Sequence, residues 1–132
     1  MMMDIEEIGK QVVDAAYQVH TTLGPGLLES SYETCLAHEL SLRNLSFELQ
    51  KSLPINYKGL KLSAGYRIDI IVESQIIIEL KSVELLQPIH KAQLLTYLKL
   101  SGCTLGYLIN FNVPLLKDGL RRVVLNHPSS QS

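Results

Sequence analysis

The spacing of apolar residues predicts two amphipathic helices in the first third of the chain. Between residues 5 and 19, apolar side chains recur at steps of three and four, which indicates a helix over about residues 4–22. The Gly-Pro-Gly sequence at 24–26 ends this helix. A second helix is expected from about residue 26 to residue 44, with Tyr32 on its inner stripe.

After residue 46 the period of the pattern becomes that of extended chain, and one further helix follows. In chain order, the expected elements are extended chain over 47–57 broken at Pro54, a turn at Lys58-Gly59, extended chain over 60–63, strands over 65–72 and 76–83, a helix from Pro88 to Ser101, and strands over 105–111 and 120–125. This order predicts one mixed α/β domain over residues 1–132, with a core of about 26–125 and a polar, frayed tail over 127–132.

Composition and charge narrow the class of protein. The chain has 132 residues, of which 46% are hydrophobic and 19% charged, and its net charge is −1. These values exclude a disordered or coiled-coil chain, and they imply that any nucleic-acid binding is local. No uncharged apolar run approaches the roughly 20 residues of a membrane helix, and the acidic segment 1–7 has no signal-peptide core. Two cysteines without CxxC spacing predict buried thiols, so we expect a cytoplasmic protein.

Charged residues interrupt the two most apolar strands. Glu79 and Lys81 are two residues apart, so they share one face of a strand, and Asp69 lies in the middle of the preceding strand. A turn at 73–75 would join these strands and bring Asp69 beside Glu79. A structural ion pair, a strand with one wet face, or pairing of Asp69 with Arg67 or Lys81 would also explain the pattern.

Two adjacent carboxylates repel each other unless a cation lies between them. Oxygen ligands favour a hard divalent ion, so Mg²⁺ or Mn²⁺ is expected at Asp69 and Glu79. Lys81 would then lie beside the metal, where it could orient a water or stabilise charge that develops on a phosphate.

Two helices offer further candidates. Glu29 shares a helical stripe with Tyr32, although an acid in a first turn is also favoured by the helix dipole. In the helix that begins at Pro88, His90, Gln93 and Tyr97 recur at i, i+3 and i+7. This polar stripe could be an ordinary solvated face, or Gln93 and Tyr97 could position a phosphate or a water.

The combined pattern resembles the PD-(D/E)XK nuclease superfamily, in the branch that includes bacterial recombination nucleases. The matching segments are Gly65…Asp69 for GxxxD, Glu79-Leu80-Lys81 for ExK, and Gln93…Tyr97 for QxxxY. The segment Gly26-Leu27-Leu28-Glu29-Ser30-Ser31-Tyr32 is similar to the signature of the small bacterial GxxExxY proteins. The similarity covers about residues 12–125, and Ile68 stands where the superfamily's name has proline.

This resemblance implies a restriction-endonuclease-like αβββαβ core with a mixed central sheet flanked by helices. It implies that Asp69, Glu79 and Lys81 form the catalytic centre, that Glu29 adds an acid, and that Gln93 and Tyr97 line the site. In some branches a histidine near the position of His20 is an extra metal ligand, although a helix-end histidine also suits the helix dipole.

Two functions follow from these observations. The first is a Mg²⁺- or Mn²⁺-dependent phosphodiesterase that acts on DNA, with a homodimer as one way to address two strands. The second is a nucleic-acid-binding or assembly module that retains the nuclease fold with little catalysis. Candidate contacts to nucleic acid are Lys51, Lys58 and Arg67, with Lys61 and the Arg121-Arg122 pair in addition, although each also suits a solvated surface. A small-molecule enzyme lacks the expected motifs, such as a Gly-rich phosphate loop.

Overall fold

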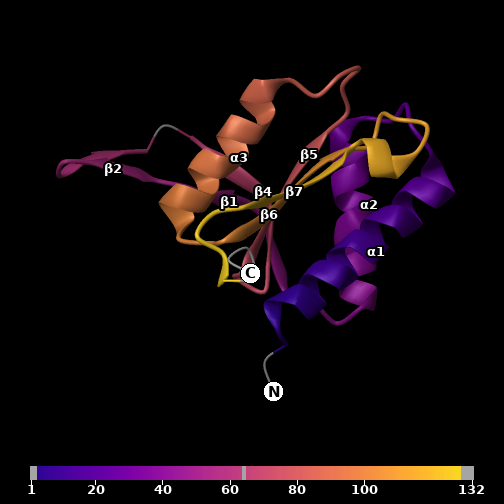
Figure 1. Ribbon diagram of the computed structural model, residues 1–132, viewed down its shortest axis with the longest axis horizontal. Coiled ribbons are helices and arrows are strands. Elements are labelled where there is room, and N and C mark those ends of the chain that lie inside the picture. The colour runs from indigo at the N-terminus through magenta and orange to yellow at the C-terminus, as the bar shows by residue number, and fades with distance from the viewer. Residues whose placement is uncertain (1–2, 64, 129–132) are drawn as a thin grey trace.

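The computed structural model describes residues 3–63 and 65–128 and consists of three helices, seven strands and a short 3₁₀ helix (Figure 1). In chain order the elements are α1 (Ile5–Leu23), α2 (Glu29–Leu42), β1 (Phe47–Ser52), β2 (Ile55–Tyr57), β3 (Leu60–Leu62), β4 (Arg67–Val72), β5 (Ile76–Lys81), α3 (Pro88–Ser101), β6 (Leu105–Asn110), η1 (Leu116–Asp118) and β7 (Leu120–Val124).

Five strands form a mixed central sheet in the order β1-β4-β5-β6-β7. The pairs β1–β4, β4–β5 and β6–β7 are antiparallel, whereas β5 and β6 are parallel and are connected through α3. This arrangement confirms the expected mixed α/β fold with a restriction-endonuclease-like core. β2 and β3 form a separate two-stranded hairpin that projects from one side of the molecule (Figure 1).

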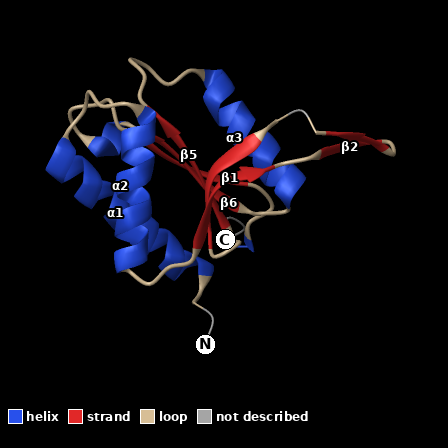
Figure 2. Ribbon diagram, turned by 180° about the vertical axis from the view of Figure 1, so that it is seen from behind, coloured by secondary structure: helices blue, strands red, loops and turns tan. Residues whose placement is uncertain are grey.

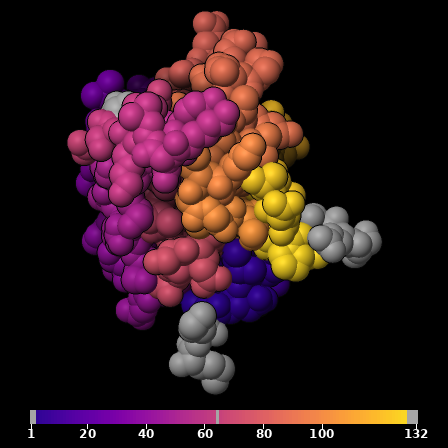
Figure 3. Space-filling model, turned by 90° about the vertical axis from the view of Figure 1, so that its left-hand side faces the viewer, coloured from indigo at the N-terminus to yellow at the C-terminus, as the bar shows by residue number. Residues whose placement is uncertain are grey.

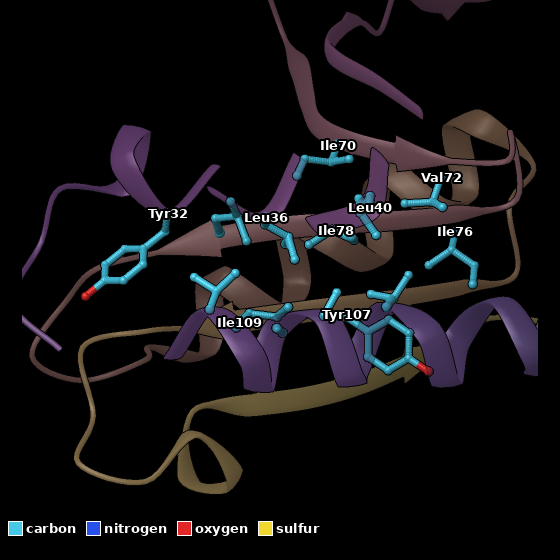
Figure 4. Packing of buried hydrophobic residues seen from close by; sticks show 14 of the residues in the cluster. Tyr32, Leu36, Leu40, Ile70, Val72, Ile76, Ile78, Tyr107 and Ile109 are labelled. Carbon is cyan, nitrogen blue, oxygen red and sulfur yellow. The ribbon is translucent and has the colours of Figure 1, made fainter. Parts of the chain in front are cut away.

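Helices cover both faces of the sheet, with α1 and α2 on one side and α3 on the other (Figure 2). The larger hydrophobic cluster lies under α1 and α2, and Figure 4 shows aliphatic side chains from the strands packing against those of α2. A second cluster packs α3 on the opposite face. Alternate residues of β5 divide between the two clusters: Ile76, Ile78 and Leu80 join the first, and Ile77 joins the second.

Two element boundaries in the structure differ from the predicted ones. α2 begins at Glu29 rather than near Gly26, whose φ of +100° is outside the helical range. β5 ends at Lys81 rather than residue 83, because the backbone N–H groups of Ser82 and Val83 donate to the side chains of Glu29 and Asn110 instead of continuing the sheet.

The predicted frayed tail is wrong at its first residue. His127 is only 1% exposed; its Nδ1 lies 2.8 Å from Thr104 Oγ1 and its Nε2 lies 2.5 Å from Glu6 Oε2. These contacts tie the end of the chain to α1 and to the start of β6. Residues 129–132 of the predicted tail lie outside the described part of the chain.

The cysteines also differ from expectation. Cys35 and Cys103 are free and half-buried rather than fully buried, since each lies at the margin of a hydrophobic cluster. No helix in the described part of the chain is both long enough and apolar enough to cross a membrane.

Candidate active site

The centre of the candidate site lies where β4 and β5 stop pairing through their backbones. The ladder between these strands ends at the Ile70–Ile78 pair. Beyond it, the backbone N–H of Asp69 donates to Glu79 Oε2 at 2.9 Å, and the backbone N–H of Leu80 donates to Asp69 Oδ2 at 2.8 Å. Each carboxylate therefore accepts an N–H of the neighbouring strand, and this exchange holds the two acids side by side.

Burial shifts the pKa values of both acids upward. Burial, and after it the negative charge of Asp69, raises the pKa of Glu79 to about 8. Burial also raises the pKa of Asp69, and Glu29 acts in the same direction. The positive charge of Lys81 lowers both pKa values, but it does not outweigh the burial. A carboxylate pair with raised pKa values is a place where an added cation would be stabilised.

A cavity of about 310 Å³ opens beside this pair, and three carboxylates line it. Glu29 and Glu33 come from successive turns of α2, and Asp69 comes from β4. Glu79 lies deeper and is 4% exposed. Acids of the sheet and acids of α2, which are far apart in the sequence, therefore meet at this cavity.

Gln50 connects the acids of α2 to those of the sheet. Its Nε2 donates to Glu33 Oε1 at 2.7 Å and to Asp69 Oδ1 at 3.3 Å. Gln50 has a φ of +52°, which is the left-handed region, although it lies inside β1. Strained backbone of this kind is often found at functional sites.

Glu29 is positioned by the loop between α1 and α2. The Tyr32 hydroxyl donates to the Gly24 carbonyl at 2.6 Å and accepts from the Leu27 N–H at 3.1 Å, and its ring stacks on Phe111 at 4.4 Å. Glu29, as the first residue of α2, accepts the N–H of Ser82 at 3.1 Å. The start of α2 is thereby bound to the end of β5, so Glu29 reaches the cavity.

Lys81 and Tyr97 approach the acids from other elements. Lys81 is half-exposed at the end of β5, and its charge acts on both Asp69 and Glu79. Tyr97 lies on α3 and is 6% exposed; burial raises its pKa, and the charges of Glu79 and Asp69 raise it further. Gln93 is one turn earlier on the same face of α3 and is half-buried.

The alternative of a structural ion pair has no support among the described residues. Asp69, Glu79 and Lys81 take part in no ion pair within 4.0 Å there. The partners of Asp69 are an N–H group and an amide rather than Arg67 or Lys81. His90, the remaining polar residue of the α3 stripe, accepts the N–H of Gln87 through Nδ1 and so caps the helix.

The structure places His20 apart from the acids. Its Nε2 lies 2.8 Å from the carbonyl oxygen of Val113, which ties the end of α1 to the loop after β6. It lines a second cavity, with Gly24 and Leu115 among its neighbours, that shares no lining residue with the cavity at Asp69. The hydrogen bond to Val113 accounts for this buried histidine without a metal.

The candidate cations on the surface fall into two groups. Lys51 pairs with Glu48 at 3.1 Å, and Arg122 binds Glu6 at 3.0 Å, which leaves these charges partly neutralised. Lys58, by contrast, lies 5.4 Å above the ring of Tyr57 at the tip of the projecting hairpin. Arg67 and Lys61 are exposed at the base and along that hairpin.

Sequence reasoning missed three residues that complete this arrangement. Gln50 and Glu33 lie in ordinary polar stretches, so no local signal distinguishes them. Asn110 ends a fully buried strand, and its side chain binds both backbone groups of Val83 at 3.1 and 2.9 Å. A polar residue at the end of a buried strand was a signal that could have identified Asn110.

The chemistry of the donors fits a hard divalent cation, which is bound in proteins chiefly by carboxylate oxygens. Asp69 and Glu79, with Glu29 on the cavity wall, would supply such oxygens. As they stand, no three His, Cys, Asp or Glu side chains of residues 3–63 and 65–128 are grouped as a formed metal cage.

Comparison with known proteins agrees with this geometry. A family model described as the PD-(D/E)XK nuclease superfamily matches residues 6–123. Comparisons with curated proteins and with solved structures found no match. The matched range contains the central sheet except for Val124, the last residue of β7, together with Glu29, Asp69, Glu79 and Lys81. The chain therefore belongs to the PD-(D/E)XK nuclease superfamily.

Proposed function

We propose that this nuclease-superfamily chain is a Mg²⁺- or Mn²⁺-dependent phosphodiesterase that cleaves DNA. One observation carries the proposal: the carboxylates of Asp69 and Glu79 each accept a backbone N–H of the neighbouring strand, at positions where burial raises both of their pKa values. Two neighbouring acids that have no ion-pair partner within 4.0 Å in the described part of the chain suit the binding of a cation.

In this proposal Asp69 and Glu79 hold the metal, and Glu29 contributes a third carboxylate from α2. When bound, the ion supplies Lewis acidity toward the scissile phosphate and makes water nucleophilic at neutral pH. The role of the protein is to keep Glu29 and Asp69 on the wall of the cavity beside Glu79, which the bond from Ser82 to Glu29 and the bond from Gln50 to Asp69 support.

In this proposal three other side chains contact the phosphate or the attacking water. Lys81 is close enough to influence both acids, so its ammonium group would stabilise negative charge on the phosphate. Tyr97, whose pKa is raised by burial and by the same acids, stays protonated and can donate a hydrogen bond. Gln93, one turn away, would bind the phosphate or orient the attacking water.

We also propose the branch of the superfamily, the source, the location and the oligomeric state of the chain. Gly26, Glu29 and Tyr32 take positions that suit a GxxExxY protein, because Gly26 has a positive φ, Glu29 faces the cavity and Tyr32 is buried. We propose this branch, a bacterial source, a cytoplasmic location and a single nuclease-like domain over residues 1–132. A homodimer is proposed only by analogy with small nucleases that address two strands.

Cleavage of DNA tests the proposal. Labelled single- and double-stranded DNA is incubated with the purified chain and Mg²⁺ or Mn²⁺, and product formation is measured. We expect Asp69→Asn and Lys81→Met each to reduce the rate by about 100-fold or more, since each removes an electrostatic contribution to the transition state. Asp118→Asn and Lys117→Met, at exposed positions in η1, are matched controls and should retain activity.

Two results would contradict the proposal. Equal activity in wild type and both site variants would show that the acids and the lysine do not catalyse cleavage. Binding of DNA by the wild type without cleavage at any metal concentration would favour the nucleic-acid-binding module.

A further inference from the structure

The chain concentrates positive charge in one segment. Of its 12 Lys and Arg residues, four lie between positions 49 and 68, whereas none of its 13 Asp and Glu residues does. These cations are Lys51, Lys58, Lys61 and Arg67. The net charge of −1 therefore conceals a local field that would attract an anionic partner.

This segment forms a projecting hairpin, which we call the hairpin arm and define as residues 55–62. Its strands β2 and β3 pair only with each other, and Gly59 has the positive φ of +89° that its tight turn requires. From Leu53 to the turn, five extended residues span roughly 16 Å. Figures 1 and 2 show the arm extending away from the central sheet.

The arm is exposed along its length. All three residues of β3 are exposed, and Tyr57 and Leu60 are 61% and 60% exposed. Figure 3, which looks at the molecule from the side of the arm, shows it in magenta beside the orange atoms of α3. A two-stranded hairpin whose side chains are mostly exposed adds little to the hydrophobic core. Stabilisation of the fold therefore does not explain the positive charge or the projecting shape of the arm.

The arm continues from two strands that carry residues of the candidate active site. The strands that lead into it are β1 and β4, and Leu53 N–H donates to the Tyr66 carbonyl at 2.9 Å to continue their pairing. Gln50 and Asp69, which line the cavity, lie on these same two strands. A ligand that contacts both the arm and the cavity would thus be bound over one continuous surface.

We propose that the hairpin arm binds the phosphodiester backbone of DNA and holds it against the cavity, an inference that rests on the proposed function. Lys58 and Lys61 contact phosphates, and Arg67 extends the contact at the base, whereas the charge of Lys51 is partly neutralised by Glu48. Tyr57, with Lys58 Nζ 5.4 Å above its ring, offers an aromatic face next to a cation. A two-stranded ribbon has dimensions that a DNA groove admits.

Charge favours DNA over a second copy of this chain. The apolar side chains of Tyr57, Leu60 and Leu62 could also pack against another protein. In a symmetric dimer whose two-fold axis passes through the arm, however, the arm would meet an identical arm, so that Lys58 and Lys61 would face like charges. Binding to DNA phosphates would instead neutralise these cations and release the counterions that are condensed on the DNA.

Binding of DNA at different salt concentrations tests the proposal. Fluorescence anisotropy with labelled single- and double-stranded DNA is measured without divalent metal, so that no cleavage occurs. The variant Lys58→Glu/Lys61→Glu is compared with Lys99→Glu/Lys117→Glu, which reverses two exposed lysines on other elements and gives the same net charge of the chain. All four positions are exposed, so both variants are expected to fold, and circular dichroism checks this.

We expect the arm variant to bind DNA at least about tenfold more weakly at low salt. The slope of log Kobs against log salt should become shallower by about 2 for duplex DNA, because two phosphate contacts are lost. The control variant should keep a slope close to that of the wild type, because a general loss of charge removes no specific contact.

Equal affinity and slope in the two double variants would overturn the inference. So would loss of a concentration-dependent dimer in the arm variant without a change in DNA binding. The experiments distinguish failure of the proposed function from failure of this inference. If the arm variant weakens DNA binding as expected but the wild type cleaves no DNA, only the catalytic proposal is overturned. Cleavage that depends on Asp69, with no effect of the arm variant on binding, overturns the arm alone.

Discussion

Glu79 is the residue whose chemistry depends most on its surroundings. It is 4% exposed, and its Oε2 accepts the N–H of Asp69 at 2.9 Å. Burial and the nearby Asp69 raise its pKa to about 8, so the metal-free protein holds a proton there at neutral pH. The unfolded chain releases that proton above its ordinary pKa of about 4.5.

This difference predicts how stability depends on pH. Glu79 binds more protons in the folded state between about pH 4.5 and pH 8, so the free energy of unfolding should fall as pH rises through that range. Glu79→Gln keeps an oxygen that accepts the Asp69 N–H but cannot ionise. We expect this variant to be more stable than wild type by a few kcal/mol (order of magnitude) at pH 8, and close to it at pH 4.5.

Urea unfolding at several pH values, in the presence of a chelator, measures this effect. Glu84→Gln, at an exposed position, is the control and should follow the wild type. A pH dependence of stability that is identical in Glu79→Gln and wild type would show that Glu79 does not retain a proton in the folded state. Asp69, whose pKa is raised in the same direction, leaves a residual slope in the variant.

At the scale of elements, the start of α2 determines whether an acid from a helix reaches the sheet. Tyr32 binds the preceding loop through its hydroxyl, and Ser82 binds both Glu29 and the carbonyl of Leu27, the latter at 2.6 Å. Asn110 holds the segment after Ser82 in place through Val83. A helix, a loop and the end of a strand thus position Glu29 together.

Removal of one hydroxyl tests this coupling. Tyr32→Phe keeps the stacking on Phe111 but loses the bonds to Gly24 and Leu27, so we expect it to destabilise the fold by about 1–2 kcal/mol. DNA cleavage should also fall, since Glu29 is less firmly held. Thermal unfolding and cleavage rates measure both effects. Tyr17→Phe, which changes a more exposed tyrosine, is the control; equal stability of the two variants would contradict the role of Tyr32.

At the scale of the whole molecule, a nearly neutral chain carries its acids and a group of its cations in different places. Acids gather at the cavity, and the cations of segment 49–68 lie on and beside the projecting hairpin. A divalent ion at the acids would offset their charge and so strengthen the attraction of a phosphate to this side of the molecule.

Metal binding should therefore stabilise the whole fold. If Mn²⁺ binds the folded chain alone, an excess of 100 times its Kd adds about 2.7 kcal/mol to the free energy of unfolding. The effect should be greater at pH 8 than at pH 6, because Glu79 must lose its proton to act as a ligand. Thermal unfolding with and without Mn²⁺ measures it. Asp69→Asn should abolish the shift and Asp118→Asn should keep it; a shift that survives in Asp69→Asn would place the metal elsewhere.

Much of the fold and part of the site follow from local pattern. The order of elements and the turns at residues 58–59 and 73–75 agree with the structure, because periodicity and turn chemistry act over a few residues. Strand alternation was sufficient to identify Glu79 and Lys81 as sharing a face. The family resemblance over nearly the whole chain agrees with the match to residues 6–123.

Only the tertiary structure decided which distant residues meet. Gln50 reaches both Glu33 and Asp69, and His127 is buried against Glu6 rather than frayed. The hairpin arm projects beside the cavity, although its cations look like ordinary surface charges in the sequence. By itself, the sequence determined the elements and the acids that two of them carry, because these depend on short repeats of polarity. The partners of those acids depend on strand order, helix position and long-range hydrogen bonds, none of which leaves a periodic trace along the chain.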